Sequence, residues 1–364
     1  MEELDLHVTN RCNLRCIHCC FNSGRQAMSE LSTRELVGVL DEAIALGARE
    51  IHVTGGEPFL RKDIFTILGA ARAKGANIRI QTNGTLLDRG VLADLAALGI
   101  DELMVSLDGP EEVNDRIRGG GTYRQAWDAV CAARALGIPL RVNTVVMKSN
   151  LASIAGFLRQ TVDLGVKTHS FFHFTPVGAG SHLPHEAVPK LEWLGFLAET
   201  GAVCRQRDVR KTRVVLEQVY VDSAEIRETD TLGCRIGFKK YCQVLCDGSV
   251  SPCTFLLYTG LFLGNVTQDS LSDIWNDPNR WEQYDAHMSV CQPCARFDLC
   301  KGGCWLYSYY HSGTFDRDPR CDGSDSVIPI CPYLKRSAHG GVIVHSTADA
   351  SGGKGDLVVD GLDA

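Results

Sequence analysis

Cysteines are the residues of this 364-residue chain that are best suited to chemistry, and it has sixteen of them. Cys12, Cys16 and Cys19 fall in one short segment, Cys-Asn-Leu-Arg-Cys-Ile-His-Cys. Three thiolates at this spacing can hold three corners of a four-iron, four-sulfur (4Fe-4S) cluster and leave the fourth iron open to substrate. Zinc is the alternative, with His18 or Cys20 as a fourth ligand. Neither His18 nor Cys20 matches the paired C-x₂-C spacing usual for zinc, so we favour iron and expect Cys20 to be a packed or partly exposed thiol.

A second group of ten cysteines lies between Cys234 and Cys331, and only Cys131 and Cys204 separate it from the first group. Thiols stay reduced in the cytosol, so a cytosolic chain this rich in cysteine is expected to use them as metal ligands. Cys131 belongs to an amphipathic helical pattern and is expected in the core. The distribution predicts two metal-binding modules.

The elements that position the first group alternate between short strands and amphipathic helices. The predicted strands are Leu4–Val8, Glu50–Thr54, Asn77–Thr82, Glu102–Leu107, Leu140–Val146 and Thr168–Phe174. The predicted helices include Thr33–Leu46, Lys62–Ala73, Arg89–Leu98 and Tyr123–Leu136. This alternation is typical of an α/β fold with a parallel sheet. Six units are fewer than the eight of a closed barrel, so we expect an open, partial barrel with its functional residues at the strand ends.

The overall composition excludes several classes of protein. The formal net charge of −7 gives no basic surface for nucleic acid. The N-terminus does not resemble a signal peptide, and no apolar run is long enough to span a membrane. We expect a cytoplasmic protein.

The first motif and its surroundings resemble the radical S-adenosylmethionine (radical SAM) superfamily. Besides the three cysteines, the segment Gly55-Gly56-Glu57-Pro58 follows the second predicted strand, as in that family. The resemblance covers residues 4–180. It implies a partial (β/α)₆ TIM-like barrel in which the cluster reduces S-adenosyl-L-methionine to a 5′-deoxyadenosyl radical that abstracts hydrogen from a substrate.

The resemblance also implies which residues contact S-adenosylmethionine. The Gly55–Pro58 segment would meet its amino group, with the carboxylate of Glu57 as acceptor. Ser106 and Arg118 would bind its carboxylate, which suits the forked guanidinium, although alone Arg118 would be taken for a surface salt bridge. The remaining positions are near the ribose, the adenine or the neighbouring strand ends: Asn83, Asn143, Pro176-Val177-Gly178 and the backbone of His18.

The second group of cysteines resembles the SPASM extension, which binds two auxiliary clusters. The pattern is Cys234-x₁₃-Gly-x₄-Cys253, then Cys291-x₂-Cys-x₅-Cys-x₃-Cys304 and a further cysteine. The resemblance implies three 4Fe-4S clusters in all. The first auxiliary cluster is assigned to Cys234, Cys242, Cys253 and Cys304, and the second to Cys291, Cys294, Cys300 and Cys321. Cys331 remains an alternative to Cys321, and a zinc ribbon remains an alternative for the central block.

The choice of Cys242 over Cys246 depends on a predicted hairpin. Asp247-Gly248 is a strong signal for a two-residue turn. Such a turn places Cys242 opposite Cys253, and directly opposed residues have Cβ atoms about 4.5–5.5 Å apart. Cys246 would lie near the turn. A longer loop would weaken the preference for Cys242.

These assignments divide the chain into four parts. Residues 1–205 form the radical SAM core, 206–232 a connector, 233–336 the SPASM domain and 337–364 a Gly-rich tail. The tail is expected to be flexible, although its Gly341–His345 run could pair as an edge strand.

Auxiliary clusters suggest a net two-electron oxidation, with the clusters accepting the electron. Eleven residues precede Cys12, so we expect no leader-binding domain before the motif. Sulfatase-maturing relatives carry Asp after the cysteine that corresponds to Cys253, whereas this chain has Thr254. The sequence therefore favours an oxidoreductase that dehydrogenates a carbinol of a sugar or aminocyclitol. The alternatives are maturation of a ribosomal peptide and a non-catalytic electron-transfer protein, which the motifs for S-adenosylmethionine disfavour.

The catalytic base is left open. His173, His182 and His185 are candidates near the expected mouth of the barrel, although each is more often a surface or packed histidine. The resemblance also implies a reducing partner such as flavodoxin or ferredoxin.

Overall fold

The computed structural model describes residues 1–25, 27–206, 212–216, 220–222, 239–285, 294, 297, 303–312, 318, 321, 327–329, 342–345 and 358–359. Four of the cysteines considered as cluster ligands lie outside these residues: Cys234, Cys291, Cys300 and Cys331. Within the described residues, no helix has both the length and the apolar character needed to cross a bilayer.

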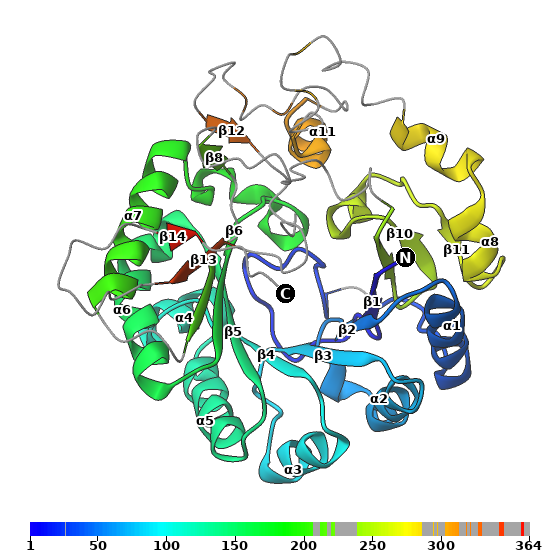
Figure 1. The fold of residues 1–364 in the computed structure, drawn as a ribbon, viewed down its shortest axis with the longest axis horizontal. Coiled ribbons are helices and arrows are strands. Elements are labelled where there is room, and N and C mark those ends of the chain that lie inside the picture. Colours follow the sequence, from blue (N-terminus) through cyan, green and yellow to red (C-terminus); the bar gives the residue numbers. More distant parts are fainter. Residues whose placement is uncertain are drawn as a thin grey trace.

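The centre of the molecule is a curved parallel sheet (Figure 1). Its strands are β1 (Glu3–His7), β2 (Glu50–Thr54), β3 (Asn77–Thr82), β4 (Glu102–Ser106), β5 (Leu140–Val146), β6 (Thr168–His173) and β7 (Arg213–Leu216). They pair in sequence order, each parallel to the next. The first six confirm the predicted strands to within one residue at each end. The partial barrel is therefore confirmed, with β7 as an added parallel strand.

Helices cover the outer face of this sheet (Figure 1). They are α1 (Thr33–Ala45), α2 (Ile64–Ala73), α3 (Arg89–Leu98), α4 (Glu111–Arg118), α5 (Thr122–Ala135), α6 (Lys148–Leu164) and α7 (Lys190–Gln206). Short 3₁₀ helices η1 (Pro58–Leu60), η2 (Gly178–His182) and η3 (Pro184–Glu186) follow β2 and β6. Helix α1 begins with a capping box in which Ser32 and Glu35 satisfy each other's backbone N–H groups.

The two faces of β1 have different environments. Leu4, Leu6 and Val8 are fully buried in the same apolar cluster as residues of α1 such as Leu36 and Leu40. Since side chains alternate along a strand, Asp5 and His7 face the other way, toward the inside of the barrel. The inner face of β1 is therefore polar and lies just before the cysteine motif.

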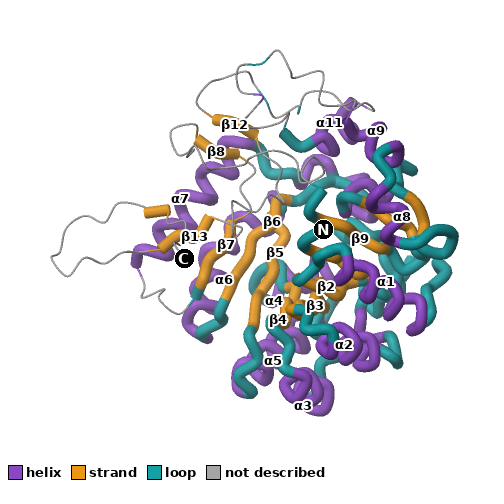
Figure 2. The backbone as a smooth tube through the Cα atoms, turned by 45° about the vertical axis from the view of Figure 1, so that its right-hand side comes forward, coloured by secondary structure: helices purple, strands orange, loops and turns teal. Residues whose placement is uncertain are grey.

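The second cysteine region extends the same sheet. Strand β9 (Tyr241–Val244) pairs parallel with β1 and antiparallel with β10 (Ser249–Ser251), which pairs with β11 (Gly264–Asn265). Helix α8 (Leu271–Asn276) then lies beside α1 (Figure 2). The next elements are η7 (Thr254–Tyr258), α9 (Asn279–Asp285) and α11 (Trp305–Ser312).

The remaining strands lie on the opposite side of the barrel. Strand β8 (Tyr220–Asp222) pairs antiparallel with β12 (Val327–Pro329). Strand β13 (Val342–His345) pairs antiparallel with both β7 and β14 (Val358–Val359). The Gly341–His345 run thus contains a paired strand, as expected, but it lies between β7 and β14 and the edge of the sheet is β14.

Candidate functional site

The three cysteines of the first motif lie on the loop that leaves β1, which we call the cysteine loop (residues 8–25). Cys16 is buried, and Cys12 and Cys19 are half-buried. Burial raises the pKa of Cys16 to about 11, and the nearby Cys19 and Cys12 thiolates add to this rise. These interactions show that the three thiols lie in one neighbourhood, although their sulfur atoms are not gathered as metal ligands are. The residue types and their spacing fit an iron–sulfur site.

The Gly-Gly-Glu-Pro segment packs against the start of this loop. The N–H of Gly56 donates to Thr9 O at 2.7 Å, and the N–H of Glu57 donates to Arg11 O at 2.8 Å. A Cβ atom on Gly56 would lie 2.2 Å from Arg11 O. Glycine is required here because the backbone approaches the cysteine loop itself so closely.

Other parts of the chain hold the end of the loop. The N–H of Ala179 donates to Cys19 O at 2.9 Å, and the hydroxyl of Tyr258 donates to Cys20 O at 2.7 Å. Burial raises the pKa of the Cys20 thiol above its usual range, which agrees with a packed thiol. Tyr258 belongs to the second region, so both halves of the chain position the cysteine loop.

Glu57 is fully buried at the end of β2. Its Oε1 accepts from the hydroxyl of Thr82 and its Oε2 accepts from the N–H of Asn83, both at 2.8 Å. Burial raises the pKa of Glu57 to about 7 in spite of these hydrogen bonds. Both carboxylate oxygens thus already bind the end of β3. The Asn83 amide in turn donates to Asn13 Oδ1 at 2.9 Å and lies 3.9 Å from Cys12 Sγ.

A buried ionic cluster joins the cysteine loop to β4 and α4. Asp108 Oδ2 lies 2.6 Å from His18 Nε2 and 2.7 Å from Arg118 Nε, and Asp108 Oδ1 accepts from the N–H of Val145 at 2.9 Å. Burial alone would raise the pKa of Asp108, but Arg118 and His18 hold it well below its usual range. Arg118 is therefore in a buried ion pair, not a surface one. The sequence predicted Ser106 and Arg118 as site residues but did not point to Asp108.

Two further predicted contacts lie together at the neighbouring strand ends. Ser106 on β4 pairs in register with Asn143 on β5, and both are buried. Among the described residues, no donor reaches the buried Oδ1 of Asn143. A free amide oxygen here can receive a hydrogen bond from a ligand.

The three candidate bases differ in environment. The ring Nε2 of His173 is 3.0 Å from Val188 O, and the ring packs against Trp193. His182 and His185 are exposed in η2 and η3. His173 therefore has a packed, structural environment and the other two are surface histidines.

The hairpin that was used to choose Cys242 has a different register from the one predicted. Val244 pairs with Val250 and Gln243 with Ser251, and the turn contains three residues, Cys246 to Gly248. Cys242 is thus one position out of register with Cys253, so the prediction that the two are directly opposed is wrong. Cys242 is fully buried in the apolar cluster behind β1, and Cys246 lies in the turn.

Asp318 connects two of the predicted auxiliary ligands. Its Oδ2 accepts from the N–H of the buried Cys304 at 2.7 Å, and its carbonyl accepts from the N–H of Cys321 at 2.9 Å. Cys294 is exposed. Across the described residues, no group of three or more His, Cys, Asp or Glu side chains is arranged to hold a metal ion.

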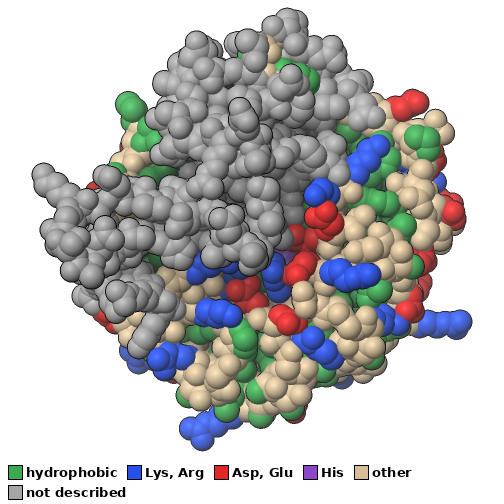
Figure 3. Space-filling model, in the orientation of Figure 1, with side chains coloured by type: hydrophobic (Ala, Val, Ile, Leu, Met, Phe, Trp, Pro, Cys, Tyr) green, Lys and Arg blue, Asp and Glu red, His purple; other side chains and the backbone are tan. Residues whose placement is uncertain are grey.

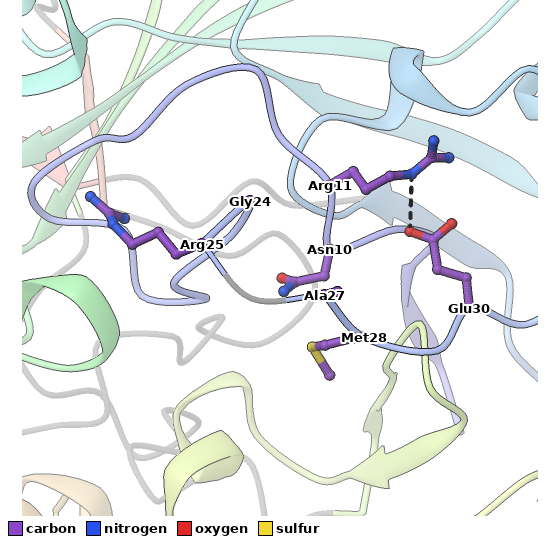
Figure 4. A pocket seen from close by; sticks show the side chains of 7 residues that line it. All are labelled: Asn10, Arg11, Gly24, Arg25, Ala27, Met28 and Glu30. Atoms are coloured by element: carbon purple, nitrogen blue, oxygen red, sulfur yellow. Dashed lines mark hydrogen bonds and ion pairs between the residues drawn. The ribbon is translucent and has the colours of Figure 1, made fainter.

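A cavity of about 450 Å³ adjoins the cysteine loop (Figure 4). Its lining residues are Asn10, Arg11, Gly24, Arg25, Ala27, Met28 and Glu30. Arg11 forms an ion pair with Glu30 at 3.3 Å, whereas Arg25 extends back to the carbonyls of Arg15 and Cys16. On the described part of the face in Figure 3, basic and acidic side chains are interspersed.

Two family models match the chain. The Radical SAM superfamily matches residues 6–160, and an iron–sulfur cluster-binding domain, SPASM, matches residues 234–305. The chain therefore belongs to the radical SAM superfamily and carries a SPASM domain. It is a radical SAM enzyme that uses S-adenosylmethionine and iron–sulfur clusters.

Relatives of known function cover most of the chain. It is 28% identical to the mycofactocin maturase MftC of Mycobacterium ulcerans, over 87% of each chain. It is 27% identical to an AdoMet-dependent heme synthase of Methanosarcina barkeri, over 86% of this chain and 94% of the relative. It is 28% identical to a PqqA peptide cyclase of Granulibacter bethesdensis, over 86% of this chain and 85% of the relative.

The fold is similar to that of Streptococcus suis SuiB bound to S-adenosylmethionine, with a TM-score of 0.74. That match covers 88% of this chain and 77% of SuiB at 20% sequence identity.

Proposed function

We propose that this enzyme matures a peptide by radical oxidation of one of its residues. The observation that carries the proposal is its likeness over most of its length to MftC, a maturase, and to a PqqA peptide cyclase. SuiB, whose fold is similar, has a crystal structure with its precursor peptide SuiA. These relatives favour the peptide alternative over the sugar or aminocyclitol dehydrogenation that the sequence alone favoured.

The residues of the first site take separate roles in this proposal. Cys12, Cys16 and Cys19 hold the cluster that, with S-adenosylmethionine, supplies a 5′-deoxyadenosyl radical. The backbone of Gly55 to Pro58 and the side chain of Asn143 bind S-adenosylmethionine. Asp108 fixes Arg118 and His18 against the cysteine loop, and Glu57 orients Asn83 beside Cys12.

The SPASM domain would hold two auxiliary clusters, for three in all. Their proposed ligands are Cys234, Cys253, Cys304 and either Cys242 or Cys246 for one cluster, and Cys291, Cys294, Cys300 and Cys321 or Cys331 for the other. These clusters would accept the electron that leaves the substrate, which makes the enzyme an oxidoreductase. A small reducing protein such as flavodoxin or ferredoxin would reduce the first cluster.

The test uses anaerobically reconstituted protein with deuterated candidate peptides encoded near its gene. We expect deuterium to appear in 5′-deoxyadenosine with the wild type and not with Cys12→Ala. We also expect about twelve irons per chain, since each 4Fe-4S cluster contains four, and about eight in the Cys12/Cys16/Cys19→Ala variant. Label transfer only from sugar alcohols or from a porphyrin would refute peptide maturation. Label transfer from a porphyrin would agree instead with the likeness to the AdoMet-dependent heme synthase.

A further inference from the structure

Two buried histidines in the barrel differ in their partners. His169 on β6 lies 2.9 Å from the hydroxyl of Thr144 and 2.8 Å from that of Thr161, one at each ring nitrogen. His7 on β1 is only 2% exposed, yet neither of its ring nitrogens forms a hydrogen bond with another described residue. A buried polar group without a partner is destabilising. His7 therefore differs from a histidine whose role is to stabilise the core.

Three other polar atoms on the same face of the sheet are in the same state. In the sheet, Asp5, two positions before His7, is level with Gln243 of β9 on one side and with His52 of β2 on the other. Both amide atoms of the fully buried Gln243, and Nε2 of His52, lack partners within the described part of the chain. Because side chains alternate along a strand, these residues share the inner face of three adjacent strands with His7. Unpaired polar atoms thus lie along the inner face of β9, β1 and β2.

The donors and acceptors of His7, Gln243 and His52 determine which ligand groups they could bind. Burial lowers the pKa of His7 to about 4, so its ring is neutral and offers one donor and one acceptor. Gln243 also offers both. His52 Nδ1 lies 2.9 Å from Asp5 Oδ1, so this nitrogen already has a partner and Nε2 is left for a further one. The other oxygen of Asp5 accepts from the hydroxyl of Tyr241 at 2.6 Å.

We propose that His7 and Gln243 form an amide-binding site inside the barrel, bordered by His52, which holds an amide group of the peptide substrate. An amide presents one N–H and one C=O, so it can pair with both donors and acceptors without bringing charge into a buried place. Phe21 of the cysteine loop packs against His7 in a tilted arrangement with ring centroids 4.5 Å apart, which places His7 beside the cysteine loop. This inference rests on the proposed function.

The first test measures the melting temperature of full-length, anaerobically reconstituted variants. Replacing an unpaired polar group by an apolar one removes a desolvation cost. We therefore expect His7→Leu and Gln243→Leu to melt at the same temperature as the wild type or higher, with unchanged iron content. The matched control His169→Leu loses two hydrogen bonds and should melt lower by about 1–4 °C. Destabilisation of the His7 and Gln243 variants equal to that of the control would contradict the proposal.

The second test measures binding of N-acetyl amino-acid amides, with methyl glycosides as polyol probes, by calorimetry. We expect amides to bind the wild type, about tenfold more weakly to His7→Leu and Gln243→Leu, and with unchanged affinity to His169→Leu. Equal amide affinity in all variants, no amide binding, or preference for the glycosides would overturn the site. The two proposals can fail separately. If the wild type binds amides and both variants do not, the site is supported; if the wild type then turns over no peptide, only the proposed function is refuted.

Discussion

The most informative single change is Asp108→Asn, because the buried carboxylate of Asp108 faces both His18 and Arg118. The substitution keeps the shape of the side chain and creates no cavity. The amide oxygen can still accept from the N–H of Val145, but the NH₂ group must then face the Arg118 guanidinium, which has only donors. Removing one partner of a buried ion pair costs about 3–5 kcal/mol. For a chain of this length that corresponds to about 4–7 °C in melting temperature.

The assay is anaerobic thermal unfolding, combined with formation of 5′-deoxyadenosine. The pKa of Asp108 is lowered in the folded protein, so its contribution to stability is fully present above its unfolded value of about 3.9 and is lost as pH falls below it. The variant should lack this acid-dependent loss.

A double variant, Asp108→Asn with Arg118→Met, tests the cause of the destabilisation. It removes both charges, so it should be more stable than Asp108→Asn alone. An Asp108→Asn variant as stable as the wild type would refute the reasoning. So would a double variant whose loss is the sum of the two single losses, because the ion pair would then contribute no coupling.

Three other predictions address the rest of the site. Gly56→Ala should lower both stability and iron content, because its Cβ would lie 2.2 Å from Arg11 O, whereas Gly69→Ala in α2 meets no atom within 4 Å and should be neutral or stabilising by up to about 1 kcal/mol. Glu57 has a folded pKa of about 7, above its unfolded value of about 4.3. The free energy of unfolding of the cluster-free protein should therefore decrease as the pH rises from about 4.3 to about 7. Denaturant titrations should show a smaller decrease over this pH range in Glu57→Gln. If Cys246 is the auxiliary ligand, Cys246→Ser should lose about four irons and Cys242→Ser should keep them; the opposite result would restore Cys242.

The sheet could be predicted from sequence because short runs that carry buried apolar residues alternate with amphipathic helices. The bounds of β2, β3 and β5 agree with the prediction at both ends. The hairpin register could not be predicted in the same way. Asp-Gly suits a two-residue turn, but a three-residue loop also requires a residue with positive φ before the second strand, and Gly248 has φ +89°. One dipeptide fits both turns, and the choice between them moves Cys242 by one position relative to Cys253.

The roles of Asp108 and His7 depend on tertiary contacts that no local pattern records. Asp108 follows β4 in the connection between a strand and a helix. It forms its two ionic contacts only because the fold places Arg118 of α4 and His18 of the cysteine loop against it. His7 continues the alternation of β1 as any inward-facing residue would. What distinguishes it from His169 is that no other described residue forms a hydrogen bond with its ring, and a sequence carries no direct signal of that.

The position of the second cysteine region relative to the first also depends on the sheet. Composition suggested two modules joined by a connector, but β9 hydrogen-bonds directly to β1, the strand that leads into Cys12. The N–H of Leu31, beyond the cysteine loop, donates to Cys246 O at 2.7 Å, and Tyr258 binds Cys20 O. A continuous backbone ladder is far stiffer than a peptide linker. Strand pairing would therefore determine the separation between the first cluster and any cluster bound at this hairpin, and a change in the register of β9 would move the proposed auxiliary ligands of the hairpin together.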